Sequence, residues 1–263
     1  MTATPKEWDV TGRRVLVTGA SSGLGLAMAR ALVTGGARVA FGGRDAQRLR
    51  AAIDESAVGT TEGLAVSLDV RDQESIAHAV TTIEDAWGGL DVLVNNAGIG
   101  MRTVNPAFLT DPQPFWQVSE DGFTAVIDTN LTGYFRVAAV VVPLLLRDGG
   151  GKIVNISMNH ETMRRRGFVP YGPSRAGAES LSLIMAEDLR PHGVDVNMLL
   201  PGGATATGMI PDDVPSEMRA RLLSPDIIAE PILYLCSGAS DGVTGARIVA
   251  TEFTEWLREH GHQ

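Results

Sequence analysis

The stretch RRVLVTGASSGLGLAMARALVTGG, residues 13–36, joins a strand pattern to a helix pattern through a glycine-rich turn. Gly19 permits a tight turn, and Gly23 and Gly25 let the backbone approach a pyrophosphate, whose charge the free N–H groups at the helix start complement. The spacing GxxxGxG differs from the commoner GxGxxG fingerprint of dinucleotide sites. The turn therefore favours a dinucleotide cofactor, although a glycine-rich turn needed only for packing would look the same.

The same succession of strand and helix patterns continues along the chain. Short β-branched runs predict strands at 13–19, 37–43, 63–70, 90–98, 151–157, 194–200 and 246–253. Helical patterns fall at 23–36, 45–56, 72–88, 124–149, 174–193 and 224–238, the last despite Pro231. Because parallel strands need crossover connections, the alternation predicts an α/β fold, a doubly wound, Rossmann-like parallel sheet of seven strands with helices on both faces. Its ligand is expected beyond the carboxyl ends of the strands, at the switch point of strand order.

Composition favours one globular domain over residues 1–263, because the chain is 44% hydrophobic and 20% charged with no segment that resembles a linker. The formal net charge of -9 disfavours nonspecific binding to nucleic acid or anionic lipid, which leaves a small molecule as the expected partner. No uninterrupted apolar run approaches the roughly 20 residues that cross a bilayer, so we expect a cytoplasmic protein. The single cysteine, Cys236, lies in an apolar helical pattern and is expected to pack in the core rather than serve redox chemistry.

The end of the second predicted strand is where a dinucleotide fold contacts the adenosine ribose. A carboxylate there binds the 2'-hydroxyl of NAD, whereas an arginine without a carboxylate accepts the 2'-phosphate of NADP. Here Gly42 and Gly43 occupy the expected acidic position and Arg44 follows, which favours NADP over NAD. The alternatives are that Arg44 is a solvated loop residue and that Asp45 either caps the next helix or binds the ribose.

These motifs and several later ones resemble those of the short-chain dehydrogenase/reductase family, in the family's order, from about residue 11 to about residue 250. LDV at 68–70 looks like the family's adenine contact, NNAG at 95–98 like its fourth-strand motif, and TNLTGYF at 129–135 like its central helix. NIS at 155–157, YGPSR at 171–175 and PGGATATGM at 201–209 look like the segments with the catalytic serine, the catalytic tyrosine and the loop over the nicotinamide.

The resemblance implies an NAD(P)-dependent oxidoreductase that transfers hydride between the nicotinamide and a secondary alcohol or ketone. The implied cofactor contacts are Gly19, Ser21, Ser22, Gly23, Leu24, Arg44, Asp69, Val70, Asn96, Ala97, Gly98, Tyr171, Arg175, Pro201, Gly202 and Thr207. It also implies a homotetramer or homodimer, and the long apolar helices predicted near residues 130–147 and 174–190 favour a four-helix contact between subunits.

Four residues are implied as catalytic: Asn130, Ser157, Tyr171 and Arg175. A tyrosine with its ordinary pKa of about 10 needs a neighbouring positive charge to act as an acid or base near neutrality, and Arg175 is four residues from Tyr171, on the same helix face. Ser157 would donate to the carbonyl oxygen as charge develops there. By resemblance, Asn130 would hold a water. In isolation, Ser157 and Asn130 would read as a strand-end hydroxyl and a helix-cap amide.

The sequence departs from the family at one of these positions, because the pattern YxxxK is here YGPSR. The family's lysine is expected to bind the nicotinamide ribose, to activate the tyrosine and to pass a proton onward. Arginine keeps the charge and the donors, but it remains protonated and cannot relay a proton. Electrostatic activation should therefore survive at Arg175, while the relay is in doubt.

Two loops are expected to border the substrate. In the loop 158–168, Met158, His160 and Met163 are candidate contacts, although a loop histidine also fits a surface role. Two interpretations are open for the charged run Arg164, Arg165 and Arg166. It either attracts an anionic substrate or is simply exposed to solvent. In the loop 98–117 the aromatic residues Phe108, Phe115 and Trp116 favour a partly apolar substrate. No DGG follows in the last segment, unlike many family members, which leaves the shape of the substrate lid open.

The sequence thus predicts an NADP-preferring alcohol dehydrogenase or carbonyl reductase. One alternative is a non-redox use of the same fold, as in an epimerase or dehydratase. Another, motivated by Arg175, is a dinucleotide-binding scaffold without turnover. No metal site is expected.

Overall fold

The computed structural model of the chain describes residues 8–56, 63–211 and 214–260. In this part of the chain seven strands form one sheet in the order β3-β2-β1-β4-β5-β6-β7, and every neighbouring pair is parallel. The strands are β1 (Arg14–Thr18), β2 (Arg38–Gly43), β3 (Gly63–Ser67), β4 (Val92–Asn95), β5 (Gly151–Ile156), β6 (Val194–Leu200) and β7 (Arg247–Val249). The predicted fold class is confirmed, and the order reverses between β1 and β4.

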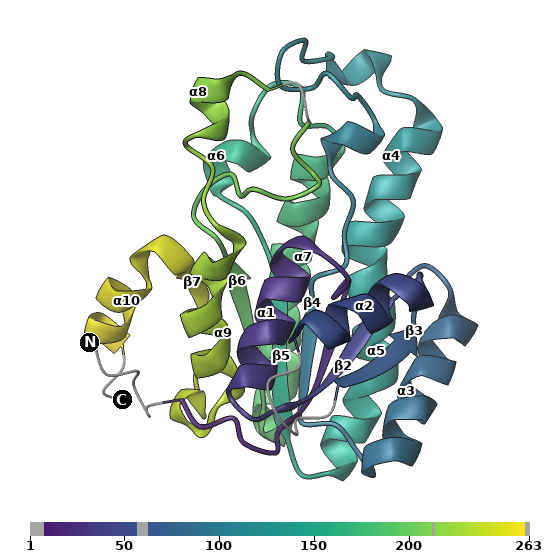
Figure 1. Cartoon of the computed structure of the whole chain (residues 1–263), viewed down its shortest axis with the longest axis vertical. Coiled ribbons are helices and arrows are strands. Elements are labelled where there is room, and N and C mark those ends of the chain that lie inside the picture. The colour runs from purple at the N-terminus through teal and green to yellow at the C-terminus, as the bar shows by residue number, and fades with distance from the viewer. Residues whose placement is uncertain (1–7, 57–62, 212–213, 261–263) are drawn as a thin grey trace.

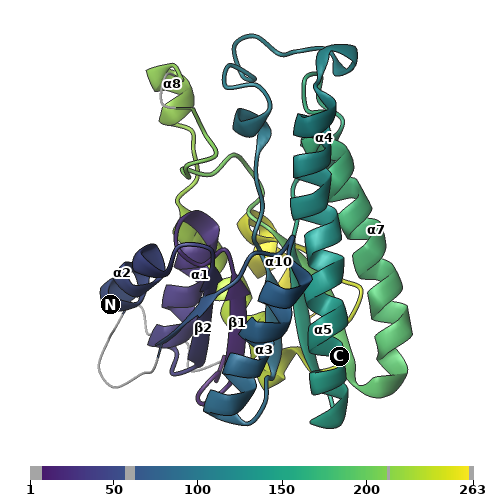
Figure 2. The ribbon, with the colours of Figure 1, turned by 90° about the vertical axis from the view of Figure 1, so that its right-hand side faces the viewer.

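Helices cover both faces of the sheet (Figures 1 and 2). One layer contains α1 (Gly23–Thr34), α2 (Ala46–Ser56), α9 (Ala229–Cys236) and α10 (Phe253–His260), and the other contains α3 (Gln73–Trp87), α5 (Gly133–Arg147) and α7 (Tyr171–Leu189). Each layer closes over its own cluster of buried apolar side chains. The strands are apolar on both faces because both faces are covered. Cys236 is fully buried, as expected for a core residue.

Helix ends follow local sequence signals. Asp72 accepts hydrogen bonds from the backbone N–H groups of Glu74 and Ser75 at the start of α3, and Gly88 ends that helix with φ of 75°. Ser119 caps α4 (Glu120–Ile127) in the same way. These caps satisfy backbone groups that the helix itself leaves unpaired. They also fix where each crossover leaves and rejoins the sheet.

A second level of structure rises beyond the carboxyl ends of the strands, at the top of Figure 1. It contains α4, α6 (His160–Met163), α8 (Ser216–Arg219) and the short turns η1 (Met101–Thr103) and η2 (Phe115–Gln117). All of these lie in segments that follow β4, β5 or β6. The segments therefore surround the edge where the sheet changes strand order, as expected for a ligand site.

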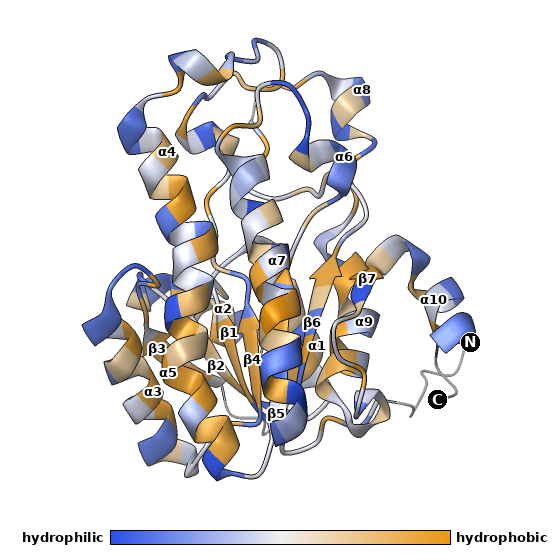
Figure 3. Ribbon diagram, turned by 180° about the vertical axis from the view of Figure 1, so that it is seen from behind, coloured by the Kyte–Doolittle hydropathy of each residue, from blue (hydrophilic) through white to orange (hydrophobic). Residues whose placement is uncertain are grey.

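The helix predicted over 124–149 is longer and contains an irregular turn. α4, the π-helical turn η3 (Asp128–Thr132) and α5 form one stretch, Glu120–Arg147, whose most apolar window has a mean hydropathy of 1.4. Length and composition alone would let it cross a bilayer, but 44% of that window is buried and α5 packs on β4, β5 and α3. Figure 3 shows this helix and α7 lying side by side over the sheet. It is a covering helix of the domain.

The last predicted strand, 246–253, is wrong in its second half. β7 ends at Val249, and the chain continues as the 3-10 turn η7 (Ala250–Glu252) and the helix α10. Phe253 is buried and, with Trp256, it packs against Tyr234 of α9 at ring-centroid distances of 5.6 and 5.8 Å. Residues three apart lie on one face of a helix, so Phe253 and Trp256 can both reach Tyr234. In a strand the same two side chains would point to opposite faces of the sheet.

Candidate active site

The glycine-rich turn is held against β4 by a short polar network. The Thr18 hydroxyl accepts hydrogen bonds from the backbone N–H groups of Asn96 and Ala97, at 2.9 and 3.0 Å. The Asn96 amide in turn donates to the carbonyl oxygens of Thr18 and Gly19, at 2.8 and 3.3 Å. Two of the predicted cofactor contacts, Asn96 and Ala97, thus use these polar groups to fix the turn at the switch point.

The turn itself has the shape that a pyrophosphate needs. Gly19 and Gly23 have positive φ values of 69° and 58°, and a side chain at Gly19 would lie 2.9 Å from the backbone of Ala97. Ser22 precedes α1 but its side chain makes no capping hydrogen bond, so the first N–H groups of this helix keep no side-chain cap. Uncapped N–H groups behind a close-packed glycine turn form an anion site, which fits a dinucleotide cofactor. The adjacent Ser21 and Leu24 are partly exposed here.

Two cations lie near the predicted ribose position, Arg44 just after β2 and Arg71 after β3. Arg44 is exposed, and Asp45 accepts hydrogen bonds from the backbone N–H groups of Gln47 and Arg48, both at 3.0 Å. Asp45 is therefore the cap of α2. Asp69 forms an ion pair of 2.7 Å with Arg71, a residue that the sequence analysis did not single out.

The charges at this end of the sheet interact. The hydrogen bond from Arg71 lowers the pKa of Asp69 below its ordinary value against the effect of burial, and the charge of Arg44 lowers it further. Asp69 is thus bound to an arginine of its own loop. Its neighbour Val70 is 6% exposed and packs against Gly133 at the start of α5.

Asn130 lies in the π-helical turn between α4 and α5 and is fully buried. Its amide donates to the Ile99 carbonyl oxygen at 2.9 Å and to the Ser174 hydroxyl at 3.2 Å, and its carbonyl accepts from the Ile99 N–H at 2.9 Å. Both amide hydrogens are therefore used to join the loop after β4 to α7. A water held by Asn130 would have to bind through an oxygen atom.

Arg175 is buried, 2% exposed, with its guanidinium between two tyrosine rings. The guanidinium carbon lies 5.3 Å from the Tyr171 ring centroid and 5.5 Å from that of Tyr134. Nη1 donates to the Tyr134 hydroxyl at 2.6 Å and to the Ile156 carbonyl oxygen at 2.9 Å, whereas the buried Nε has no partner among the described residues. Nη2 lies against Gly98, where a side chain would come within 2.6 Å of it.

Burial and the neighbouring tyrosine hydroxyls shift the pKa of Arg175 in opposite directions. Burial lowers the pKa of Arg175, but Tyr134 and Tyr171 raise it by more, so the guanidinium stays protonated. Burial also raises the pKa of Tyr134, against the opposing effect of Arg175, and the neutral Tyr134 hydroxyl donates to Ile156 at 3.2 Å. The site therefore holds a permanent buried positive charge beside the Tyr171 ring.

Ser157 directs its hydroxyl at a carboxylate. Its Oγ donates to Glu179 Oε1 at 2.6 Å, and both residues are buried. Glu179 Oε1 also accepts from Arg247 Nε, and Oε2 contacts His160 Nε2, both at 2.9 Å. Of the predicted substrate contacts, His160 thus lies beside Glu179, while the Met163 carbonyl packs against Gly172.

An apolar cluster borders Tyr171. Met101, Phe108 and Phe168 are buried in it, with Met158 and Tyr171 among the residues packed on them. Phe108, from the loop 98–117, is therefore part of the apolar cluster on which Tyr171 packs. Phe115 and Trp116 are not part of this cluster: they are 67% and 72% exposed and pack on each other at the end of that loop. Of the three arginines 164–166, Arg165 lies over the Phe168 ring and all are exposed.

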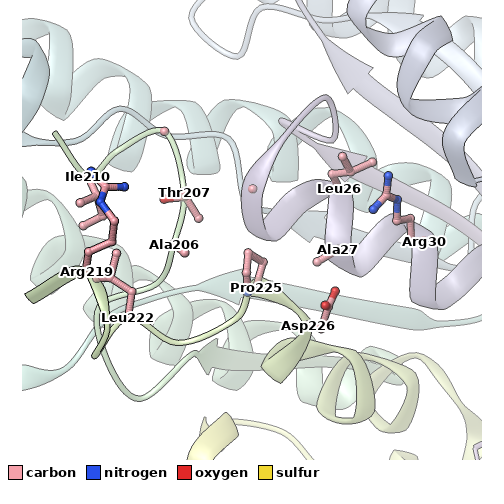
Figure 4. A pocket seen from close by; sticks show the side chains of 12 residues that line it. Leu26, Ala27, Arg30, Ala206, Thr207, Ile210, Arg219, Leu222, Pro225 and Asp226 are labelled. Carbon is pink, nitrogen blue, oxygen red and sulfur yellow. The ribbon is translucent and has the colours of Figure 1, made fainter. Parts of the chain in front are cut away.

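The loop 201–211 closes over the glycine turn. Pro201 is buried at its start and Gly202 has φ of 96°. The Thr207 methyl lies 3.2 Å from where a side chain at Gly23 would be, and Met209 Sδ is 4.0 Å from the Tyr171 hydroxyl. Figure 4 shows the cleft of about 610 Å³ between this loop and α1, with Thr207 and Arg30 on opposite sides. The loop therefore reaches from the cofactor turn to Tyr171.

A model of the short chain dehydrogenase family matches residues 13–217. The chain belongs to this family. As a short-chain dehydrogenase it is an oxidoreductase, and the cofactor of the family is NAD(H) or NADP(H). Among the residues described here, no group of three or more His, Cys, Asp or Glu side chains is placed to hold a metal ion.

Several short-chain dehydrogenases and reductases are similar to the chain. It is 35% identical to gluconate 5-dehydrogenase of Gluconobacter oxydans over 75% of this chain and 73% of that protein. It is 33% identical to a 3-oxoacyl-acyl-carrier-protein reductase of Vibrio harveyi over 90% of this chain and 95% of that protein. A crystal structure of a short-chain type dehydrogenase/reductase from Mycobacterium marinum superposes with a TM-score of 0.81 at 27% identity, covering 94% of this chain and 97% of that one.

Around Ser157 and Arg175 of this short-chain dehydrogenase, three polar residues were not predicted from the sequence: Tyr134, Glu179 and Arg247. Glu179 carried a usable signal, because Tyr171, Arg175 and Glu179 follow at steps of four and share one helix face. A carboxylate on that face, in an otherwise apolar segment, indicates a buried partner. Tyr134 and Arg247 carried no such signal, since their partners lie 41 and 68 residues away.

Proposed function

We propose that this short-chain dehydrogenase is an NADP-preferring alcohol dehydrogenase or carbonyl reductase that acts on a secondary alcohol or ketone. The observation that carries the proposal is the position of Tyr171, an ionisable hydroxyl beside the buried cation of Arg175 and the apolar wall. An acid–base group with a neighbouring permanent charge is what hydride transfer to a carbonyl requires from a protein.

In this proposal a bound nicotinamide supplies or accepts the hydride. Tyr171 gives the carbonyl oxygen its proton in reduction and removes the hydroxyl proton in oxidation. Arg175 stabilises the phenolate form, and its Nη2, which lies against Gly98, is the donor left for the ribose hydroxyls. Ser157 is the proposed hydroxyl beside the substrate oxygen, to which it can donate only when its proton leaves Glu179. Asn130 holds the loop after β4 to the start of α7, and a water bound to one of its oxygen atoms would link the site to solvent.

The direct test is a panel of alcohols and ketones, with the absorbance of NADPH and NADH as the readout. Apolar cyclic and aliphatic ketones should be reduced best, because Met101, Phe108 and Phe168 border Tyr171. Consumption of reduced cofactor that depends on the ketone would support the proposal. Tight cofactor binding without turnover on any compound would favour the second candidate below.

The second candidate is a dinucleotide-binding protein that does not perform net redox chemistry, as in an epimerase, dehydratase or scaffold. Two observations favour it: arginine at the lysine position, and the single hydroxyl proton of Ser157 directed at Glu179 instead of the cleft. An epimerase or dehydratase would retain and recycle its bound cofactor, whereas a scaffold would show no turnover. Cofactor content before and after incubation with a converted substrate separates these outcomes.

Removing Arg44 should weaken NADPH binding selectively. Arg44 is exposed just after β2, Gly42 and Gly43 offer no carboxylate, and Asp45 uses its Oδ1 to cap α2. Arg44→Ala should cost about 1.5 to 3 kcal/mol for NADPH. The measurement is the dissociation constant of NADPH and NADH by calorimetry, with Arg48→Ala as the control. Equal wild-type affinities for the two cofactors, or equal losses in Arg44→Ala, would contradict NADP preference.

We also propose that the protein is a cytoplasmic homotetramer or homodimer that pairs through α5 and α7. Phe135 of α5 is 54% exposed, and Leu183 and Ile184 of α7 are 49% and 57% exposed. Three large apolar side chains on adjoining helices are more than an isolated surface usually leaves in water. Ile184→Glu combined with Leu183→Glu should reduce the mass measured by light scattering toward the monomer value of 27.8 kDa. A monomeric wild-type protein at micromolar concentration would refute the assembly.

A further inference from the structure

A chain of hydrogen bonds runs from the end of β5 to the protein surface. The Ser157 hydroxyl donates to Glu179 Oε1 at 2.6 Å, and Glu179 Oε2 contacts His160 Nε2 at 2.9 Å. Ser157 is 7% and Glu179 is 9% exposed, whereas the His160 side chain is 54% exposed. Three groups that can each accept and release a proton therefore connect the buried site to solvent.

The carboxyl group of Glu179, the middle member of these hydrogen bonds, is ionised. Burial raises its pKa, but the hydrogen bonds from Ser157, His160 and Arg247 and the charge of Arg247 lower it by more, so the pKa lies below its ordinary value. A carboxylate can only accept hydrogen bonds, so the Ser157 hydroxyl must be the donor. The charged and titratable groups that contact Glu179 are His160 from α6 and Arg247 from β7.

Arg247 holds the Ser157–Glu179–His160 hydrogen bonds in position through two contacts. Its Nε donates to Glu179 Oε1 at 2.9 Å, and its second nitrogen, Nη2, donates to the Met158 carbonyl oxygen, also at 2.9 Å. Met158 follows Ser157 directly, so one guanidinium fixes both the carboxylate and the backbone beside the serine. Oε2 is left for His160.

The site needs a proton route that Arg175 does not offer. Each alcohol oxidation leaves one proton on Tyr171, which must reach solvent before the next turnover. A guanidinium retains its protons at accessible pH, and Nη1 of Arg175 is already bound to Tyr134 and Ile156. The lysine that would release and regain a proton at this position is absent from the sequence.

We propose that Ser157, Glu179 and His160 form the proton exit of this enzyme, in place of the lysine relay. The inference rests on the proposed function, in which Tyr171 and Ser157 both face the substrate oxygen. Tyr171 packs on the same apolar cluster as Met158, the neighbour of Ser157. Glu179 and His160 are positioning and relay residues that do not contact the substrate.

The transfers balance as follows in the oxidation direction. Once the ketone has left, a solvent water between Tyr171 and Ser157 takes the phenol proton as the Tyr171 O–H bond breaks, and it gives one of its own protons to Ser157 Oγ. The original Ser157 O–H bond breaks and one forms at the Glu179 carboxylate. His160 rests with its Nε2–H donated to Glu179, so the half-exposed ring first turns to present its unprotonated Nδ1. The carboxylic acid gives its proton to Nδ1 while Nε2 releases its proton to water, and the next turnover uses the two nitrogens in exchanged roles. Ketone reduction uses the same transfers in reverse to bring a proton in.

Turnover gives the first test, in weak buffer with saturating alcohol and oxidised cofactor. His160→Ala should lower kcat by about tenfold, with little change in KM, because proton release becomes limiting. Added imidazole should restore kcat with saturation, since it replaces the missing ring. His192→Ala, a change of the same kind at an exposed histidine after α7, is the matched control. A kcat for His160→Ala equal to wild type, or a loss that imidazole does not restore, would overturn the relay.

A second measurement needs neither substrate nor cofactor. The Ser157 proton, in a charge-assisted bond of 2.6 Å, should give a downfield NMR resonance that is absent in Ser157→Ala. Its exchange with water should slow at least severalfold in His160→Ala and remain unchanged in His192→Ala. Unchanged exchange in His160→Ala would refute the path even in an active enzyme. Slowed exchange in a protein that converts no alcohol would refute the proposed function and leave the path standing.

Discussion

Tyr171→Phe should reduce kcat by about a thousandfold or more while leaving cofactor binding close to wild type. General acid–base catalysis contributes about 10² to 10⁴ in rate, and phenylalanine keeps the ring but deletes the only hydroxyl proton at that position. The ring still packs on the apolar cluster of Met101, Phe108 and Phe168, and its contact with the Arg175 guanidinium is retained. The fold should therefore be unaffected.

The measurements are the steady-state rate on a ketone that wild type converts and the dissociation constant of NADPH. Tyr234→Phe is the matched control, because Tyr234 is a buried tyrosine of α9, which covers the opposite face of the sheet from α7. It should keep full activity. A Tyr171→Phe protein with more than about a tenth of the wild-type rate would show that another group handles the proton.

Arg175→Ala should reduce kcat/KM by about 100-fold or more. The guanidinium is a permanent charge over the Tyr171 ring, and its loss removes a positive charge that would stabilise the negative charge developing on the phenol oxygen during proton transfer. Cofactor affinity should fall as well, because Nη2 is the proposed donor to the ribose. The truncation also leaves the Tyr134 hydroxyl and the Ile156 carbonyl without their shared donor, so some loss of stability is expected.

Arg175→Lys separates charge from shape and should be tolerated or even faster than wild type. Lysine restores a mobile proton and keeps the charge, although it cannot fork between Tyr134 and the cleft. Lys6 and Lys152 are the only lysines among the 22 basic residues, so arginine at 175 matches the usage of the whole chain. The readout is the pH dependence of kcat/KM, with Arg190→Ala, an exposed arginine just after α7, as the control. Wild-type rate and pH dependence in Arg175→Ala would mean that the guanidinium has no part in the chemistry.

Arg175→Lys also tests the proposed proton exit through Ser157, Glu179 and His160. If Ser157, Glu179 and His160 carry the proton, Arg175→Lys offers a second route and should make the enzyme less sensitive to His160→Ala. The double variant Arg175→Lys, His160→Ala should therefore lose less in kcat than His160→Ala alone. Simple multiplication of the two single effects would indicate that the sites act independently.

Sequence alone was sufficient for the parts of the fold that depend on neighbours along the chain. The turn at 18–25 and the alternation of strand and helix are local, because turn geometry and side-chain period involve residues within a few positions. The capping of α2 by Asp45, which the sequence left as one of two alternatives, is equally local. The prediction of a strand over the second half of 246–253 was wrong because Phe253 and Trp256 pack on Tyr234. No local sequence pattern reveals that partner.

The order of Ser157, Tyr171 and Arg175 along the chain pointed to the family's chemistry, but only the tertiary structure decided what each group contacts. The Ser157 proton goes to Glu179, 22 residues away, and Nη1 of Arg175 goes to Tyr134, 41 residues away. A hydroxyl has one proton and a guanidinium nitrogen a fixed set of donors, so their use depends on which acceptors the packed helices bring within about 3 Å. Those distances are fixed by the packing of α5, α6 and α7 against the sheet, and spacing in the sequence does not contain them.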